Sequence, residues 1–213
     1  MKYIIMCGGE YGWMMPRQMT KVCGEHIVAR TIRLLRAEGI GDISISTKDK
    51  RFLIFNVPLL EHDNSFKVDK NNSVKGCWAD GFYPTSEPAC YIMGDVVFSP
   101  DAIRTIIHTE VKSVQFFAST PPFSSDYIKL WGEPFAFKVV DQKRFRAAID
   151  FVRANVNTGI FRRPPISWEL WQVLNGFNTR EINYDSIVSI NDYTCDIDKP
   201  EDAKEIEAVI CKL

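Results

Sequence analysis

Short apolar runs alternate with amphipathic segments along the whole chain. Apolar or alternating runs predict strands at residues 3–6, 42–47, 90–93, 114–118 and 135–140. Apolar residues at helical spacing predict helices at 27–38, from Pro100 to about 108, after Asp141, at 166–174 and from about Pro200 onwards. This alternation is typical of an α/β fold with a largely parallel sheet, which binds ligands beyond the carboxyl ends of its strands.

Several helix boundaries carry recognisable signals. Ser99-Pro100 places a capping hydroxyl before a proline in the first turn, and Asp141 precedes the next amphipathic segment as a capping carboxylate. Gly39 and Gly176 follow the last apolar positions of their segments, where a glycine commonly ends a helix.

Composition narrows the class of protein. The 213 residues are 46% hydrophobic, enough for one large domain spanning 1–213, and the net charge of −1 favours neither nucleic acid nor an anionic membrane as partner. No apolar run reaches the length of about 20 residues that spans a bilayer, and the N-terminus lacks signal-peptide features. We therefore expect a cytoplasmic protein. Its six cysteines have no metal-ligand spacing, and we expect them to be reduced, buried side chains.

The stretch MCGGEYGWMMPRQMTKVCGEHI, residues 6–27, joins the first strand to the first helix. Glycines let backbone N–H groups approach a phosphate, and Arg17 and Lys21 add positive charge. The glycines could equally serve a tight turn. The spacing fits neither the dinucleotide fingerprint nor the P-loop.

Two acidic features follow later in the chain. Asp95 comes directly after a buried strand and Gly94, where a carboxylate can hold Mg²⁺, although an aspartate that starts a turn is common. Asp196 and Asp198 lie two residues apart before Pro200, so both face the same way on an extended segment. The alternative role of Asp198 is to cap the last helix.

The order glycine loop, Gly-Asp and Asp-x-Asp resembles the nucleotidyltransferases that join a nucleoside monophosphate from an NTP to a phosphorylated sugar or alcohol. PRQMTKVCGEHI (16–27), YIMGDVVFSPDAI (91–103) and DIDKPEDAKEI (196–206) resemble the family's conserved segments. The nearest subgroup is the small sugar-phosphate and phosphocholine cytidylyltransferases. The resemblance implies a Rossmann-like, mixed but mostly parallel sheet flanked by helices, of the nucleotide-diphospho-sugar transferase (GT-A-like) type. It also implies an Mg²⁺-dependent, pyrophosphate-releasing enzyme that makes a nucleotide-activated product for polysaccharide or cell-surface biosynthesis.

The resemblance also assigns roles to particular residues. Asp95 and Asp198 would bind Mg²⁺, and Arg17 and Lys21 would neutralise the triphosphate. Residues 155–185 would form an acceptor-side insertion, with Trp168, Glu169 and Asp196 at the acceptor. The implied nucleotide-binding residues are Met6, Cys7, Gly8, Gly9, Gly12, Arg17, Asn72 and Ser73. An alternative for the helix that contains Trp168, Trp171 and Leu174 is simple packing, and exposed tryptophans there would permit a homodimer.

Two departures leave other functions open. Met14 stands where the family has an arginine, and Arg17 stands where it has a lysine. A non-catalytic nucleotide-binding domain would explain this altered loop, but the retention of Asp95 and Asp198 favours an enzyme. A GT-A-type glycosyltransferase would use a mid-chain Asp-x-Asp for its sugar nucleotide, whereas the mid-chain motif here has one aspartate. The sequence identifies neither the NTP nor the acceptor.

Overall fold

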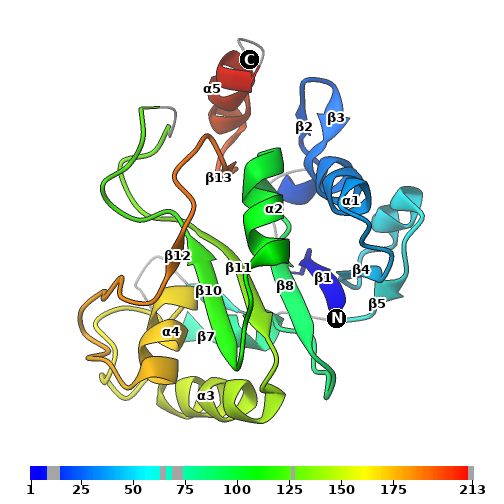
Figure 1. Ribbon diagram of the computed structural model, residues 1–213. Coiled ribbons are helices and arrows are strands. Elements are labelled where there is room, and N and C mark those ends of the chain that lie inside the picture. The colour runs from blue at the N-terminus through cyan, green and yellow to red at the C-terminus, as the bar shows by residue number, and fades with distance from the viewer. Residues whose placement is uncertain (9–14, 63–65, 69–73, 126–127, 211–213) are drawn as a thin grey trace.

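A seven-stranded sheet forms the centre of the molecule (Figure 1). The computed structural model describes residues 1–8, 15–62, 66–68, 74–125 and 128–210. The strand order is β12-β10-β11-β8-β1-β4-β5. The strands are β1 (Lys2–Met6), β4 (Ile43–Ser46), β5 (Leu59–Leu60), β8 (Ala89–Met93), β10 (Val114–Ala118), β11 (Pro134–Val139) and β12 (Val188–Ser189).

The sheet is mixed, with mostly parallel neighbours, as predicted. Strand β1 runs parallel to both β4 and β8, β4 runs parallel to β5, and β10 runs parallel to β12. Strand β11 is antiparallel to β8 and β10. No helix crosses over between β10 and β11 in the part of this loop that the structure describes, and strands joined without a crossover pair antiparallel.

The structure describes five α-helices, and two predicted caps are confirmed. Ser99 Oγ accepts a hydrogen bond from the N–H of Ala102, and Asp141 accepts one from the N–H of Arg144. Gly176 ends its helix in the left-handed conformation, with φ 66°. The described helices are α1 (Ile27–Ala37), α2 (Pro100–His108), α3 (Gln142–Asn155), α4 (Ser167–Asn175) and α5 (Pro200–Ile210).

Successive residues of β11 show how the helices cover the two faces of the sheet. The Phe137 ring packs against Phe145 of α3 and Trp171 of α4, at centroid distances of 5.7 and 6.5 Å. Lys138 points to the opposite face, because neighbouring strand residues alternate. Its ammonium donates to the carbonyls at the end of α2, including those of Ile107 (2.6 Å) and Thr109 (2.8 Å). Helices α3 and α4 therefore lie on one face and α2 on the other.

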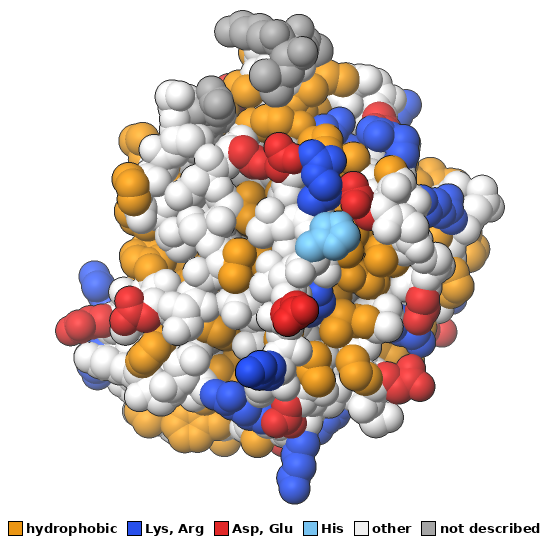
Figure 2. Space-filling model, in the orientation of Figure 1, with side chains coloured by type: hydrophobic (Ala, Val, Ile, Leu, Met, Phe, Trp, Pro, Cys, Tyr) orange, Lys and Arg blue, Asp and Glu red, His pale blue; other side chains and the backbone are white. Residues whose placement is uncertain are grey.

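Shorter elements complete the fold. Three two-stranded pairs join β2 (Lys21–Val22) to β3 (Glu25–His26), β6 (Lys67–Val68) to β7 (Val74–Lys75), and β9 (Val96–Val97) to β13 (Cys195–Asp196). The 3₁₀ helices are η1 (Arg17–Met19), η2 (Lys50–Phe55) and η3 (Trp78–Gly81). Among the described helices, none has the length and apolarity to cross a bilayer. Charges of both signs are interspersed on the face shown in Figure 2.

Two expectations about which side chains are buried and which are exposed need correction. Four of the cysteines are buried, but Cys23 is exposed in the β2–β3 turn, and Cys211 lies outside the described residues. Trp168 and Trp171 are only 4% and 2% exposed, so they provide no aromatic surface for a dimer. Helix α4 is buried around most of its circumference, as the packing interpretation of its apolar residues expects.

Candidate active site

The Gly94-Asp95 pair lies where β1 and β8 end side by side. Met6 and Met93 are paired in the sheet, and the N–H of Gly94 donates to the carbonyl of Met6 (3.1 Å). A Cβ atom on Gly94 would lie 2.5 Å from that carbonyl oxygen and 2.6 Å from Cys7 Sγ. Only glycine fits here without displacement, and Asp95 follows it directly at the carboxyl edge of the sheet.

A two-residue pairing brings the late acidic segment to Asp95. Strand β13 pairs antiparallel with β9, with Asp196 opposite Val96. The N–H of Ile197 donates to the carbonyl of Asp95 at 2.8 Å. Asp95 and Asp198 thus share one site although about a hundred residues separate them in the chain.

Asp198 does not carry out the alternative role of capping α5 through its own side chain. Asp202 stabilises this turn instead, because its Oδ2 accepts the N–H groups of Asp198 (2.8 Å) and Lys199 (3.2 Å). The Asp198 carboxylate is left to bind side chains from elsewhere in the chain.

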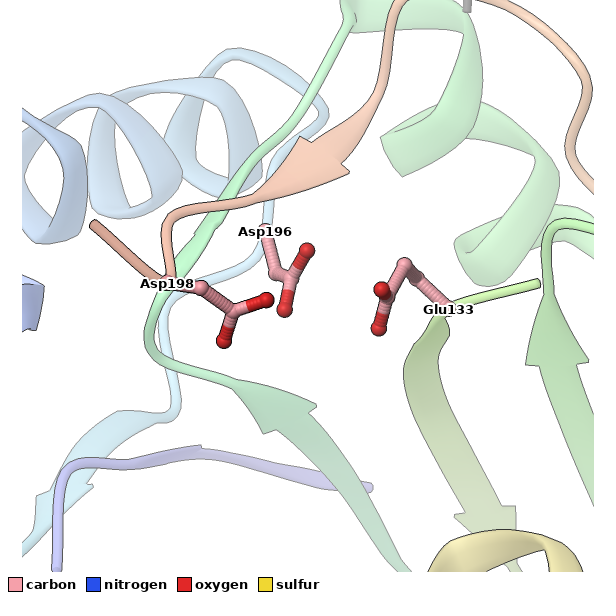
Figure 3. Close-up of side chains that lie close together, drawn as sticks. All are labelled: Glu133, Asp196 and Asp198. Atoms are coloured by element: carbon pink, nitrogen blue, oxygen red, sulfur yellow. The ribbon is translucent and has the colours of Figure 1, made fainter. Parts of the chain in front are cut away.

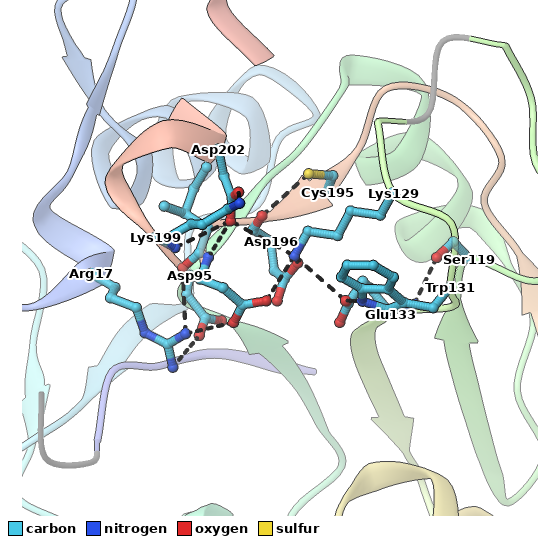
Figure 4. Close-up of polar contacts among 12 residues, drawn as sticks. Arg17, Asp95, Ser119, Lys129, Trp131, Glu133, Cys195, Asp196, Lys199 and Asp202 are labelled. Carbon is cyan, nitrogen blue, oxygen red and sulfur yellow. Dashed lines mark hydrogen bonds and ion pairs between the residues drawn. The ribbon is translucent and has the colours of Figure 1, made fainter. Parts of the chain in front are cut away.

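Arg17 links the two predicted metal ligands (Figure 4). One guanidinium nitrogen donates to Asp198 Oδ1 at 2.8 Å, and the other lies 3.5 Å from Asp95 Oδ2. The Arg17 side chain is 31% exposed. Arg17, Asp95 and Asp198, predicted from three separate motifs, therefore meet at one point.

Two residues of this site were missed by the sequence analysis. Lys129 and Glu133 lie in the segment between β10 and β11, and no motif marked either of them. The carboxylates of Glu133, Asp196 and Asp198 lie within 4.8 Å of one another and point toward a common centre (Figure 3). Lys129 Nζ contacts all three carboxylates, Asp196 most closely and Asp198 Oδ2 at 2.9 Å.

Burial and neighbouring charges change the pKa values of these carboxyl groups. Burial, together with the neighbouring Glu133, raises the pKa of Asp196 to about 8. Burial also raises the pKa of Asp95. Burial would likewise raise the pKa of Asp198, but the hydrogen bonds and positive charges of Lys129 and Arg17 together outweigh this effect and lower it. Burial thus disfavours the ionised forms of Asp95 and Asp196, and an added cation at Asp95 would stabilise its carboxylate.

A cavity of about 490 Å³ opens beside these groups. This volume is within the usual range for small-molecule sites. Two of the polar atoms that belong to its lining residues, Gln18 Oε1 and Ser167 Oγ, are buried and have no hydrogen-bond partner among the described residues. Because both atoms are buried, neither presents a hydrogen-bonding group to the open space of the cavity. Other lining residues include Met6, Gly8, Arg17, Trp78, Asp95, Trp131, Glu133, Arg163, Trp168, Asp196 and Asp198.

The three predicted acceptor residues lie in different places: Asp196 belongs to the carboxylate group, whereas Trp168 and Glu169 lie on α4. Trp168 lines the cavity, and its ring is packed edge-on against Phe116 at 5.2 Å. Glu169 lies behind the wall. Its carboxylate accepts hydrogen bonds from Arg163 Nε (2.7 Å) and from the N–H of Ile166 (2.9 Å), and the latter bond satisfies an N–H at the start of α4. Arg163, rather than Glu169, reaches the cavity.

The remaining predicted residues are less closely associated with the site. Lys21 is exposed in the β2–β3 pair and is not among the cavity-lining residues. Cys7 is buried against Gly94, behind the surface that Met6 and Gly8 present. Gly9, Gly12, Met14, Asn72 and Ser73 lie outside the described residues, so their assigned roles stay predictions.

Comparison with known proteins gives matches in structure alone. No protein-family model and no curated protein sequence matches the chain. A Bacillus anthracis structure assigned as a glucose-1-phosphate thymidylyltransferase aligns with a TM-score of 0.61 at 13% identity, over 100% of this chain and 96% of that one. The 4-diphosphocytidyl-2C-methyl-D-erythritol synthase of Anaerococcus prevotii aligns with a TM-score of 0.59 at 14% identity, over 99% and 95%. The inositol-1-phosphate CTP transferase of T. maritima aligns with a TM-score of 0.52 at 15% identity, over 98% and 95%.

These alignments span nearly the full length of each neighbour; two of the neighbours are named as nucleotidyltransferases and the third as a synthase. The chain therefore has the nucleotide-diphospho-sugar transferase fold, and the predicted architecture is confirmed. At 13–15% identity the likeness shows the fold alone, so an activity must be argued from the residues of the site.

Proposed function

We propose that this protein is an Mg²⁺-dependent nucleotidyltransferase. In the proposed reaction a phosphate oxygen of a phosphorylated sugar or alcohol attacks the α-phosphorus of an NTP, and pyrophosphate leaves. The observation that carries the proposal is the convergence of Arg17, Asp95 and Asp198 beside a cavity at the carboxyl edge of this fold.

The donor atoms fit a magnesium ion. Carboxylate oxygens are hard ligands, and Mg²⁺ usually takes one or two of them and completes its shell with water and phosphate oxygens. Asp95 and Asp198 would hold the ion, and both line the cavity. When bound, it would polarise the phosphoryl oxygens at the reacting centre.

The chain's own residues would bind and orient the reactants. The acceptor phosphate is already ionised, so the reaction needs no general base, and the protein has to align the reactants and offset their charge. Arg17 is partly exposed and borders the cavity, so its guanidinium can turn from the two aspartates to triphosphate oxygens. This movement would free one oxygen of each carboxylate, Asp95 Oδ2 and Asp198 Oδ1, for the metal.

The opposite wall of the cavity would receive the acceptor. Arg163 offers a guanidinium for an acceptor phosphate, held in place by Glu169 at 2.7 Å. The Trp168 ring also lines this wall. This arrangement supports the proposal that residues 155–185 form the acceptor side. The base and the acceptor stay open, and a cytidylyltransferase that functions in the cytoplasm is our first choice.

The glycosyltransferase alternative is less well supported. In that function an Asp-x-Asp pair would bind a metal and a sugar diphosphate. Here Asp196 is 9% exposed and is hydrogen-bonded to the buried ammonium of Lys129. Of the two aspartates, only Asp198 also binds Arg17, a partly exposed cation that a ligand could replace.

The test is pyrophosphate release from each of CTP, UTP, GTP, ATP and dTTP with a panel of phosphorylated sugars and alcohols. We expect one NTP and acceptor pair to give metal-dependent pyrophosphate and an equal amount of a nucleotide-linked product by mass spectrometry. Asp95→Asn is the matched control, because it removes one charge without changing side-chain size, and it should abolish turnover. Sugar-nucleotide hydrolysis with no pyrophosphate formation from any pair would refute the proposal in favour of the glycosyltransferase.

A further inference from the structure

Lys129 occupies the centre of the carboxylate group that is best arranged to hold a metal ion. Its Nζ atom lies 2.9 Å from Asp198 Oδ2 and 3.5 Å from Glu133 Oε1, and it makes its closest contact with Asp196 Oδ1. These three carboxylates are the ones that lie within 4.8 Å of one another (Figures 3 and 4). An ammonium has three N–H donors, and each finds a carboxylate here.

Several contacts keep this ammonium in place. The Lys129 side chain is 5% exposed, and a fourth carboxylate, that of Asp202, lies 4.0 Å from its Nζ atom. Glu133 is fixed by the Trp131 indole N–H and by the backbone, because its own N–H donates to Ser119 Oγ at 2.8 Å. Withdrawing the lysine would leave buried carboxylates without a partner, which is a large cost.

Arg17 and Lys129 approach Asp198 from different sides. Arg17 binds Oδ1, is 31% exposed and lines the cavity. Lys129 binds Oδ2, is buried and is not among the cavity-lining residues. A nucleotide can therefore reach Arg17 and draw it away, whereas Lys129 stays out of its reach.

We propose that Lys129 is a built-in cation that takes the place of a second metal ion among Glu133, Asp196 and Asp198. The inference deepens the proposed function: catalysis would use a single metal ion, on the Asp95 side of Asp198. Lys129 is then a positioning residue that orients Asp198 and keeps Asp196 and Glu133 from binding metal.

The test counts Mn²⁺ ions without nucleotide, by electron paramagnetic resonance of free Mn²⁺ during titration. Lys129→Met keeps the length of the side chain and removes its charge. We expect this variant to bind one more Mn²⁺ per chain than the wild type, because the three carboxylates then lack their ammonium partner. Lys143→Met, on an exposed position of α3, controls for the loss of one positive charge and should match the wild type. Adding Asp196→Asn to Lys129→Met should abolish the gain.

A second variant keeps the inference testable if Lys129→Met fails to fold. In Asp95→Asn with Lys129 intact, we expect no bound Mn²⁺, because Lys129 blocks the other set of ligands. A bound Mn²⁺ in Asp95→Asn, or no additional Mn²⁺ in folded Lys129→Met, would overturn the proposal. These counts need neither nucleotide nor turnover. The inference about Lys129 and the proposed enzyme activity can therefore fail independently of each other. A protein that releases no pyrophosphate can still show the expected Mn²⁺ counts, and an active enzyme can show the opposite counts.

Discussion

Substitution of Gly94 by alanine tests whether the close approach of β1 and β8 sets the position of Asp95. The new Cβ atom would lie 2.5 Å from the Met6 carbonyl oxygen, and ordinary contact begins near 3.4 Å, so these groups must separate by about 0.9 Å. The carbonyl cannot withdraw freely, because it accepts the N–H of Gly94. Overpacking of this size costs about 1–3 kcal/mol. A displacement of about 1 Å at a reacting centre costs roughly 100-fold in rate.

We therefore expect Gly94→Ala to lose 1–3 kcal/mol of unfolding free energy in urea and about 10- to 100-fold in the rate of pyrophosphate release. Gly41→Ala is the matched control, because a Cβ atom there meets nothing within 4 Å. It should retain wild-type activity and stability. If Gly94→Ala behaves like Gly41→Ala in both measurements, the two strands relax without moving Asp95, and the reasoning is wrong.

Three further predictions concern separate parts of the molecule. Arg17→Ala should weaken NTP binding by about 10- to 100-fold in calorimetry and NMP binding much less, because a charged hydrogen bond to the outer phosphates is lost; equal losses would remove its proposed role. Lys138→Met should lower the unfolding free energy by about 2–4 kcal/mol, because it leaves the carbonyls of Ile106, Ile107 and Thr109 without this donor. The control Lys143→Met, at an exposed position, should change the unfolding free energy by less than about 0.5 kcal/mol. Glu169→Gln should raise the KM for the acceptor several-fold and leave the KM for the NTP unchanged, because it weakens the support of Arg163; an unchanged acceptor KM would confine Glu169 to the start of α4.

The main elements were predictable because each has a signal within its own residues. Helix α2 has its Ser99 cap and first-turn proline, and β8 is apolar along its whole length. The two-residue strands β9 and β13 have no such signal, because two residues are too few to establish a period. Their pairing, which brings Asp196 to Asp95, is a tertiary interaction that appears only in the folded chain.

The residues of the candidate site also divide into those with a local sequence signal and those without one. Arg17, Asp95 and Asp198 could be identified because each lies in a segment with a recognisable motif. Lys129 and Glu133 lie in an irregular segment. Their importance comes from their approach to Asp196 and Asp198, which are 63 or more positions away in the sequence. A buried lysine beside acidic residues leaves no local pattern, so sequence reasoning had no means of finding it.

The β9–β13 pairing also ties the stability of the protein to its ligands. Arg17, Asp95 and Asp198 belong to segments that come together only when the chain is folded. A ligand that contacts all three has no equivalent site on the unfolded chain, so its binding energy adds to the free energy of unfolding. At about 100 times its dissociation constant, such a ligand contributes about 2.7 kcal/mol. In a cell that degrades unfolded chains, the amount of this protein would then rise and fall with the supply of the molecules that it binds.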